Sequence, residues 1–321
     1  MKVGIIGAGS IAGTMAGTIR EMDCAQNYAV AARDYGRAAE FAQTYGFEKA
    51  YGSYEELVED AGVELVYIAT PHSHHYEHIK LCLNHGKHVL CEKSFTVNES
   101  QAREVLALAR EKKLLLTEAI WTRYMPMRKT LDSVLSSGVI GRPYMLTANL
   151  GYIISGKERI MRPELAGGAL LDVGIYPLNF ASMVFGDEVD SITGTAVMTE
   201  TGVDAQNSIT ITYKDGKMAA LCSSAMGLSD RRGIIYGDNG FIEVENINNC
   251  EGIRVYDRSR NMIASYDTPK QISGYEVEAC LRAIKEGALE CPEMPHEATL
   301  RMMGWMDELR RQWGLVYPME R

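Results

Sequence analysis

Three side chains, in two separate stretches of the chain, could carry proton-transfer chemistry. The first is Lys93, which follows a short apolar run from His88 to Cys91 in the sequence HVLCEKSFTVN. An unpaired buried ammonium is costly, so the charge of Lys93 needs water, a charged partner or a ligand. The structural alternative is a lysine that extends from a strand end into water, as most such lysines do.

The other two are Asp172 and Tyr176, in the sequence GGALLDVGIYP. Residues four apart project from the same face of a helix. The neighbours are almost wholly apolar, so Asp172 must be paired, and Lys93 is an obvious partner if the two segments meet. Pro177 should distort this helix about one turn back, near Val173. Alternatively, Asp172 satisfies backbone donors and Tyr176 is a core aromatic.

Together, these groups could oxidise a secondary alcohol, which requires a hydride acceptor and a base for the hydroxyl proton. We predict that Tyr176 carries the proton. A phenol ordinarily ionises near pH 10, and a nearby Lys93 ammonium would favour the phenolate. Asp172 would then hold Lys93 charged and oriented. The reverse assignment, with Lys93 as proton carrier and Tyr176 as binder, stays open.

A glycine-rich turn, GAGSIA at residues 7–12, follows the first apolar run and opens a helical pattern. In that context a GxGxxA motif predicts dinucleotide binding. The first glycine permits the tight turn, the second lets a pyrophosphate approach the backbone, and the alanine lets helix and strand pack closely. The helix N-terminus supplies N–H donors. The expected cofactor-binding residues here are Gly7, Gly9, Ser10, Ile11 and Ala12.

The end of the second apolar run bears on the choice between NAD and NADP. An acidic residue there hydrogen-bonds the ribose hydroxyls of NAD, whereas a basic residue binds the 2′-phosphate of NADP. Here the run ends in Arg33 and Asp34, with Arg37 one turn on. Arg33 and Arg37 suit a phosphate, and Asp34 is interpreted most simply as the cap of the next helix. NADP is therefore favoured, with NAD as the alternative.

Composition limits the classes of function. With 321 residues the chain is long enough for two domains, and its apolar fraction of 46% is that of a globular protein. A net charge of −9 opposes binding to nucleic acid or anionic membranes. The seven cysteines are scattered without a CxxC pair, and the glycine-rich start is unlike a signal peptide, so a reduced cytoplasmic location is expected.

The first 119 residues alternate apolar runs with amphipathic helices. We predict parallel strands at KVGII, YAVAA, ELVYIA, HVLC and KLLLTEA, because their apolar residues do not alternate with polar ones. The helices between them are predicted at 38–45, 53–60, 74–85 and 98–112. This pattern predicts an α/β fold with a doubly wound Rossmann sheet in a dinucleotide-binding domain, residues 1–120.

The pattern changes after about Trp121. A helix is predicted from Met127 to Ser136, a strand from Tyr144 to Ile153 and a helical segment from Ala166 to Phe185. Successive strands joined by hairpin turns then run from residue 191 to 266, which predicts a large, mainly antiparallel open sheet. Two helices, 275–286 and 297–313, close a second α/β domain assigned to 121–321.

A histidine-rich stretch, PHSHH at residues 71–75 followed by His78, could suggest a metal site, since His74 and His78 lie four apart. We do not predict a metal site, because the chain has no HExxH motif and no third ligand at a spacing typical of a metal site. Cys91 could be proposed as a nucleophile, but a buried strand cysteine is the simpler interpretation.

Several of these motifs together resemble the glucose-fructose oxidoreductase/inositol dehydrogenase family (Gfo/Idh/MocA). They are Gly7-x-Gly9-x-x-Ala12, Thr70-Pro71-His72, Glu92-Lys93 and the glycine-rich segment that carries Asp172 and Tyr176. The sequence EAIWTRY, residues 118–124, narrows the resemblance to the NADP-dependent trans-1,2-dihydrobenzene-1,2-diol dehydrogenase and D-xylose 1-dehydrogenase branch.

The resemblance implies roles for individual residues. Lys93, Asp172 and Tyr176 match catalytic positions, and Asp172 and Tyr176 would also bind substrate. The loop after the predicted strand ELVYIA would lie against the cofactor, together with the Glu92-Lys93 pair. The residues of that loop are Thr70, Pro71, His72 and His75. Trp121 and Arg123 would wall a substrate pocket for a polyol or a ring diol, with core packing as the alternative for Trp121.

The resemblance also implies a homodimer, or a higher homo-oligomer, formed through the open sheet. One departure from the family is Ser94, which stands where relatives usually have proline. Two other functions stay open: a cofactor-dependent glycosidase or lyase with transient oxidation, and a non-catalytic NADP-binding sensor.

Overall fold

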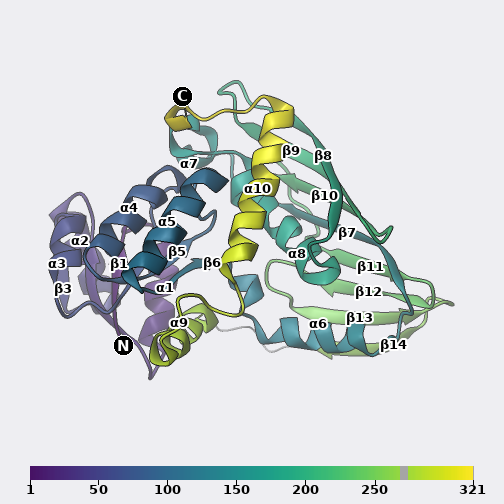
Figure 1. Cartoon of the computed structure of the whole chain (residues 1–321), viewed down its shortest axis with the longest axis horizontal. Helices are drawn as coiled ribbons and strands as arrows, with labels where there is room; N and C mark the ends of the chain where they lie inside the picture. Colours follow the sequence, from purple (N-terminus) through teal and green to yellow (C-terminus); the bar gives the residue numbers. More distant parts are fainter. Residues whose placement is uncertain (268–273, 321) are drawn as a thin grey trace. The chain divides into compact units, whose positions relative to one another are not determined.

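The computed structural model describes residues 1–267 and 274–320, which pack into two compact units (Figure 1). Unit 1 comprises Met1–Trp121 and Ile272–Met303, and unit 2 comprises Thr122–Gln271 and Gly304–Arg321.

Unit 1 contains a six-stranded sheet in the order β3-β2-β1-β4-β5-β6, with every neighbouring pair parallel. Its strands are β1 (Lys2–Ile6), β2 (Gln26–Ala31), β3 (Lys49–Tyr51), β4 (Leu65–Ile68), β5 (His88–Glu92) and β6 (Leu116–Ala119). This strand order is that of a Rossmann sheet, as predicted. The prediction missed β3, a three-residue edge strand without a fully buried residue.

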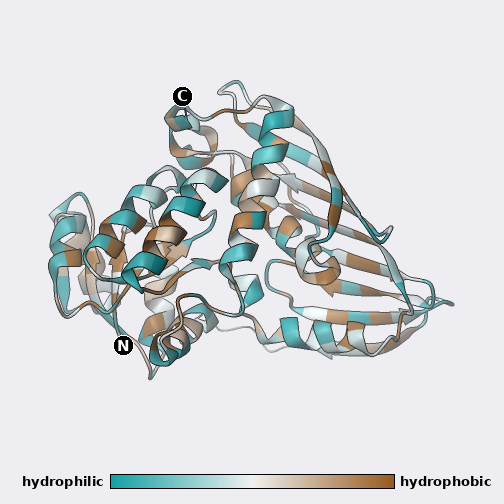
Figure 2. Ribbon diagram, in the orientation of Figure 1, coloured by the Kyte–Doolittle hydropathy of each residue, from teal (hydrophilic) through white to brown (hydrophobic). Residues whose placement is uncertain are grey.

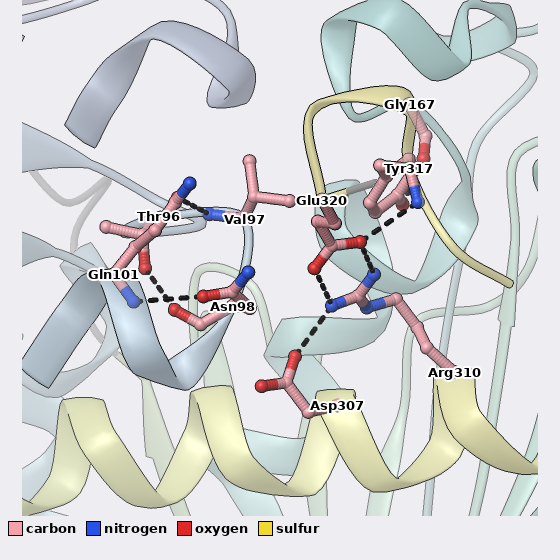
Figure 3. A network of polar contacts seen from close by, with 9 residues as sticks. All are labelled: Thr96, Val97, Asn98, Gln101, Gly167, Asp307, Arg310, Tyr317 and Glu320. Carbon is pink, nitrogen blue, oxygen red and sulfur yellow. Dashed lines mark hydrogen bonds and ion pairs between the residues drawn. The ribbon is translucent and has the colours of Figure 1, made fainter. Parts of the chain in front are cut away.

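Helices α1 (Ser10–Arg20), α2 (Tyr35–Tyr45), α3 (Tyr54–Glu59), α4 (His72–Asn84) and α5 (Glu99–Lys112) connect these strands. Side-chain caps fix where several of them begin. Asp34 accepts the N–H of Arg37 at the start of α2, and Asn98 accepts the N–H of Gln101 at the start of α5 (Figure 3). Such caps satisfy backbone donors that have no partner within the helix.

The C-terminal helices correct the predicted domain division. Residues 274–303, with α9 (Tyr275–Glu286) and the first turns of α10 (His296–Trp313), group with unit 1 rather than with the second domain. The N–H of Leu116 donates to Leu289 O at 3.2 Å, and His296 Nε2 contacts Leu116 O at 2.9 Å. Strand β6 is the edge of the sheet, so its free backbone groups need such partners.

Unit 2 contains an eight-stranded sheet in the order β14-β13-β12-β11-β7-β10-β9-β8. Among the described strands of this sheet, only the pair β7 and β10 is parallel, so the predicted mainly antiparallel sheet is confirmed. The strands are β7 (Pro143–Gly151), β8 (Val189–Met198), β9 (Asp204–Tyr213), β10 (Met218–Ser224), β11 (Gly233–Gly237), β12 (Gly240–Glu245), β13 (Gly252–Asp257) and β14 (Met262–Asp267).

Burial alternates along the central strands of this sheet, and Figure 2 shows the matching alternation of hydropathy. In β10, Ala219, Leu221 and Ser223 are buried, whereas Met218 and Cys222 are exposed. The buried face packs against a π-helical turn, η3 (Leu170–Gly174), and helix α8 (Ile175–Phe185). The remaining helices of unit 2 are α6 (Pro126–Ser136), α7 (Glu158–Met161) and the short 3₁₀ turns η2 (Pro163–Leu165) and η4 (Pro318–Glu320).

The segment Pro163–Phe185 has the length and mean hydropathy of a membrane-spanning helix, but 83% of its apolar window is buried inside the fold. Burial to that extent is what the core helix of a globular domain shows. The apolar run therefore supports the structure that carries Asp172 and Tyr176.

Candidate active site

The glycine-rich turn lies between β1 and α1 and has the geometry of a phosphate cradle. Gly7 has φ +103°, and a Cβ there would lie 2.8 Å from Ala69 O, so only glycine fits. A Cβ on Gly9 would meet no atom within 4 Å, so the backbone is open at that point. No side chain of the described residues caps α1, whose first N–H groups remain available to a phosphate.

The burial of the other residues of this turn fits their predicted roles. Ala12 is fully buried against the sheet, whereas Ser10 and Ile11 are exposed beside the open cradle. These observations fit the pyrophosphate of a dinucleotide.

At the end of β2, Arg33 is exposed, and Asp34 serves as the cap of α2, with its Oδ1 2.8 Å from the N–H of Arg37. The Arg37 guanidinium donates to Ala8 O at 2.9 Å, which places a second cation beside the glycine-rich turn. Burial, followed by the charge of Arg33, lowers the pKa of His74. The capping interpretation of Asp34 is confirmed, and the positive charge at this strand end suits a phosphate better than a ribose hydroxyl.

The histidine-rich stretch begins α4, with Pro71 as its N-cap residue. His75 is fully buried, and its ring nitrogens lie 2.8 Å from Thr70 O and 2.8 Å from Ser94 O. Burial lowers the pKa of His75 to about 4, against the carbonyl oxygens of Thr70 and Ser94, which raise it. This histidine therefore connects the loop after β4 with the loop after β5.

His72 and His78 of α4 also contact neighbouring side chains. His78 Nδ1 lies 3.0 Å from Thr70 Oγ1, and the buried His72 packs its ring against His75. Within residues 1–267 and 274–320, no group of three or more His, Cys, Asp or Glu side chains is arranged to hold a metal ion.

Glu92 and Lys93 stand where β5 ends. The Tyr67 hydroxyl, from β4, donates to Glu92 Oε1, and the Lys93 N–H donates to Glu92 Oε2 at 3.2 Å. Burial, reinforced by the charge of Glu92, raises the pKa of Tyr67 well above its ordinary value, which keeps the phenol a donor. The Lys93–Ser94 peptide bond is cis. Sequence reasoning did not identify Tyr67, because no motif links it to Glu92.

Asp172 and Tyr176 lie where the π-helical turn η3 passes into α8. The Ile175 N–H donates to Leu170 O, five residues back, as a π-turn requires. This confirms the predicted distortion near Val173. Asp172 is 5% exposed, whereas Tyr176 is partly exposed.

Arg159, on α7, is a partner of Asp172 within unit 2. Its guanidinium contacts the two carboxylate oxygens at 2.6 and 3.5 Å. The prediction that Asp172 must be paired is confirmed, but the sequence did not identify Arg159. Its separation of thirteen residues from Asp172 follows no helical or strand period.

The loop before the π-turn is held by the C-terminal segment (Figure 3). The Tyr317 hydroxyl donates to Gly167 O at 2.6 Å, and Tyr317 is fully buried. Arg310, on α10, binds both carboxylate oxygens of Glu320 at 2.7 and 2.9 Å, and Glu320 accepts the Tyr317 N–H at 2.9 Å. No sequence motif indicated this network either.

Arg123 closes the short 3₁₀ turn η1 (Trp121–Arg123) and contacts α8. It donates to Asn179 Oδ1 at 2.6 Å and to Ser182 Oγ at 3.1 Å. Arg123 therefore supports the helix that carries Tyr176, and its contact with substrate stays a prediction. Trp121 is partly exposed at the end of unit 1.

The structure thus assembles two parts of the predicted site. In unit 1, the strand ends after β4 and β5 bring Thr70, His75 and Glu92 beside Lys93. In unit 2, the π-turn brings Asp172 and Tyr176 onto one short segment. That Lys93 meets Asp172 and Tyr176 stays a prediction. Cys91 is fully buried, and burial raises the pKa of its thiol, as expected of a structural cysteine.

Comparison with known proteins gives matches along the whole chain. A family model described as an oxidoreductase family with an NAD-binding Rossmann fold matches residues 1–120, and a model of the GFO/IDH/MocA C-terminal domain matches residues 129–243. Trans-1,2-dihydrobenzene-1,2-diol dehydrogenase of Homo sapiens is 34% identical over 332 residues, covering 100% of this chain and 99% of its own. The Xenopus tropicalis enzyme of that name is 33% identical over 327 residues, covering 99% of both chains.

Solved structures share the fold. A 3-ketoreductase from Actinomadura kijaniata, in complex with NADP and TDP-benzene, has a TM-score of 0.89 at 24% identity and covers 97% of each chain. An aldose-aldose oxidoreductase from Caulobacter crescentus, complexed with glycerol, has a TM-score of 0.86 at 19% identity and covers 97% of each chain.

Proposed function

Because the chain belongs to the Gfo/Idh/MocA family of NAD(P)-dependent oxidoreductases, we propose that it interconverts a secondary alcohol and its carbonyl in a sugar, polyol or cyclic diol, with NADP as cofactor. The observation that carries this proposal is the π-turn of unit 2. It presents Tyr176 four residues after a buried carboxylate, Asp172, whose charge is compensated by Arg159.

The proposed cofactor site follows from the cradle in unit 1. Gly7, Gly9 and the first turn of α1 would hold the pyrophosphate, and Arg33 with Arg37 would hold the 2′-phosphate. When bound, NADP supplies the acceptor for the hydride that leaves the alcohol carbon. The loops fixed by His75 and Glu92 would line the path toward Lys93.

The chain's own residues would handle the proton. We assign Tyr176 as the group that takes the hydroxyl proton during oxidation and returns it during reduction. Lys93 would favour the phenolate of Tyr176 and hydrogen-bond the substrate oxygen, while Asp172 would keep Lys93 charged. Arg159 fixes the orientation of the Asp172 carboxylate, because its contacts reach both oxygens.

The Tyr176→Phe variant tests this assignment. We expect turnover to fall by about 10²- to 10⁴-fold, while NADP affinity, measured by fluorescence titration, stays within about twofold. Tyr144→Phe is the matched control, since Tyr144 is an exposed tyrosine on β7 of the same unit. Unchanged turnover in Tyr176→Phe would remove this phenol from the mechanism.

A substrate screen separates the proposed reaction from its alternatives. Pentoses, hexoses, inositols and dihydrodiols are incubated with NADP or NAD while the absorbance of the reduced cofactor is followed. Steady formation of NADPH supports a dehydrogenase. Sugar release without net NADPH would indicate the glycosidase or lyase, and tight NADP binding without turnover would indicate the sensor.

We also propose a homodimer formed through the open face of the unit 2 sheet. Strand pairing places six large side chains in one row across that face: Met218, Met145, Tyr236, Phe241, Tyr256 and Met262. The three methionines are 41–57% exposed, and a row of this kind supports burial against a second copy. Light scattering, which measures the mass of the oligomer, tests this proposal. The double variant Met145→Lys, Met218→Lys should be a monomer, whereas the control variant Glu111→Lys, on α5, should remain a dimer.

A reducing, cytoplasmic location is proposed from the cysteines. Among the described residues no disulfide joins any of the seven, and Cys82, Cys91, Cys280 and Cys291 are buried. Titration of the denatured protein with a thiol reagent, after purification without reductant, should find seven thiols. Fewer would indicate disulfides and an oxidising compartment.

A further inference from the structure

A chain of buried polar groups lies beneath the π-turn that carries Asp172. Ser223 Oγ donates to Asn207 Oδ1 at 2.9 Å, and Asn207 Nδ2 donates to Asp204 Oδ2 at 2.9 Å. The same Asp204 oxygen accepts the N–H of Leu170, the first residue of the π-turn, at 2.8 Å. Ser223 is 5% exposed, Asn207 is 6% exposed and Asp204 is fully buried. The proposed mechanism uses none of them.

Asp204 satisfies a backbone donor that the helix cannot satisfy itself. The first N–H groups of a helix have no intrahelical acceptor, and a buried N–H without a partner is costly. Leu170 is fully buried, and no side chain from its own segment caps the turn. The acceptor therefore comes from β9, more than thirty residues later in the chain, and it fixes where the π-turn begins.

The carboxylate also packs tightly against the loop that leads into the turn. A Cβ on Gly168 would lie 2.3 Å from Asp204 Oδ1, and Gly168 has φ +111°. Oδ1 has no hydrogen-bond partner among the described residues and lies against Gly168. At the other end of the turn, a Cβ on Gly174 would lie 3.0 Å from Ser223 Oγ. The polar chain thus contacts the turn at both ends.

Tyr317 holds the same loop from another direction. Its hydroxyl donates to Gly167 O, and the Arg310–Glu320 pair fixes its backbone (Figure 3). Gly167 and Leu170 are three residues apart, so the entry to the π-turn is held at a carbonyl by Tyr317 and at an N–H by Asp204.

We propose that Asp204 is a positioning residue, which fixes the π-turn so that Asp172 and Tyr176 keep the orientation that the reaction requires. This inference rests on the proposed function of that pair. Misplacement of a reacting group by about 1 Å can cost about 100-fold in rate, so loss of the contact with Leu170 should slow the chemical step. Cofactor binding should not change, because Asp204 belongs to unit 2 and the proposed cradle to unit 1.

The test compares Asp204→Ala with Asp204→Asn, which keeps an amide oxygen able to accept the Leu170 N–H. The substrate is the sugar, inositol or dihydrodiol that the wild-type enzyme oxidises fastest, with and without deuterium at the oxidised carbon. We measure kcat, KM, the deuterium isotope effect on kcat, and amide hydrogen exchange of residues 168–178. The matched control is Asp257→Ala, which removes a carboxylate that accepts two backbone N–H groups in the β13–β14 turn.

Asp204→Ala should lower kcat by about 10- to 100-fold, raise the isotope effect and speed exchange at 168–178, with KM for NADP unchanged. Asp204→Asn should restore kcat to within about threefold of wild type. The isotope effect separates misalignment from partial unfolding, because a smaller fraction of active enzyme lowers apparent kcat and leaves the isotope effect as it was. If Asp204→Ala fails to fold, Tyr317→Phe should change the isotope effect and the exchange in the same direction.

A wild-type kcat in Asp204→Ala, or equal losses in the Ala and Asn variants, would overturn the proposal. Failure of the proposed function gives a different result. In that case Tyr176→Phe, assayed alongside, retains wild-type turnover, or the wild-type enzyme oxidises no substrate in the screen.

Discussion

Ionisation of Asp204 should make the stability of unit 2 depend on pH. Burial raises the pKa of this carboxyl from its ordinary value of 3.8 to about 6, against the hydrogen bonds from Asn207 and Leu170 and the charge of Arg310, which lower it. A carboxyl with a raised folded-state pKa favours folding fully below pH 3.8. That contribution is lost as the pH rises toward and through about 6.

The expected size follows from the shift. Two pKa units correspond to about 3 kcal/mol at 1.36 kcal/mol per unit. Asp204→Asn removes the titrating group and keeps the shape. The free energy of unfolding of wild type relative to Asp204→Asn should therefore fall by about 3 kcal/mol between pH 3 and pH 7, about 2 kcal/mol of it above pH 4, and stay constant above pH 7.

Urea unfolding followed by tryptophan fluorescence at several pH values measures this difference, since Trp305 and Trp313 both belong to unit 2. Asp257 provides a control, because its pKa is shifted in the opposite direction to that of Asp204. Backbone N–H groups, first that of Asn261, lower its pKa, so the stabilisation it provides is lost as the pH falls. A difference between wild type and Asp204→Asn that is independent of pH from 4 to 8 would refute the reasoning.

Three further outcomes are expected. Arg33→Asp should shift cofactor preference toward NAD, measured as the ratio of kcat/KM for the two cofactors; retained NADP selectivity would contradict the assignment of β2. Arg159→Met should lower both kcat and the melting temperature, because it removes the guanidinium from Asp172. The loss in the free energy of unfolding should be about 1–3 kcal/mol. This is less than for a fully buried ion pair, because the Arg159 side chain is 39% exposed. Gly168→Ala should cost about 1–3 kcal/mol or more in chemical unfolding, because of its positive φ and the approach of Asp204 Oδ1, and a wild-type midpoint would show that the loop rearranges freely.

Local sequence patterns were sufficient for most of the fold because each signal lies within one element. Apolar runs without alternation predicted β1, β2, β4, β5 and β6, since parallel strands are covered on both faces. The short edge strand β3 was missed, because three partly buried residues carry no period. Local patterns did not indicate that residues 274–303 group with unit 1, because the contact of His296 on α10 is with the edge strand β6, 180 residues earlier in the chain.

Within the candidate site, local patterns were enough to predict the glycine-rich turn, the cap at Asp34, and the helical spacing of Asp172 and Tyr176 with a distortion near Val173. The groups that support these residues became visible in the folded chain. Arg159, Tyr67 and Asp204 reach the site from other elements, and their contacts depend on how strands and loops pack. A period in the sequence specifies which face a residue occupies, but the partner of a buried charge or N–H is whatever group the folded chain brings within about 3 Å.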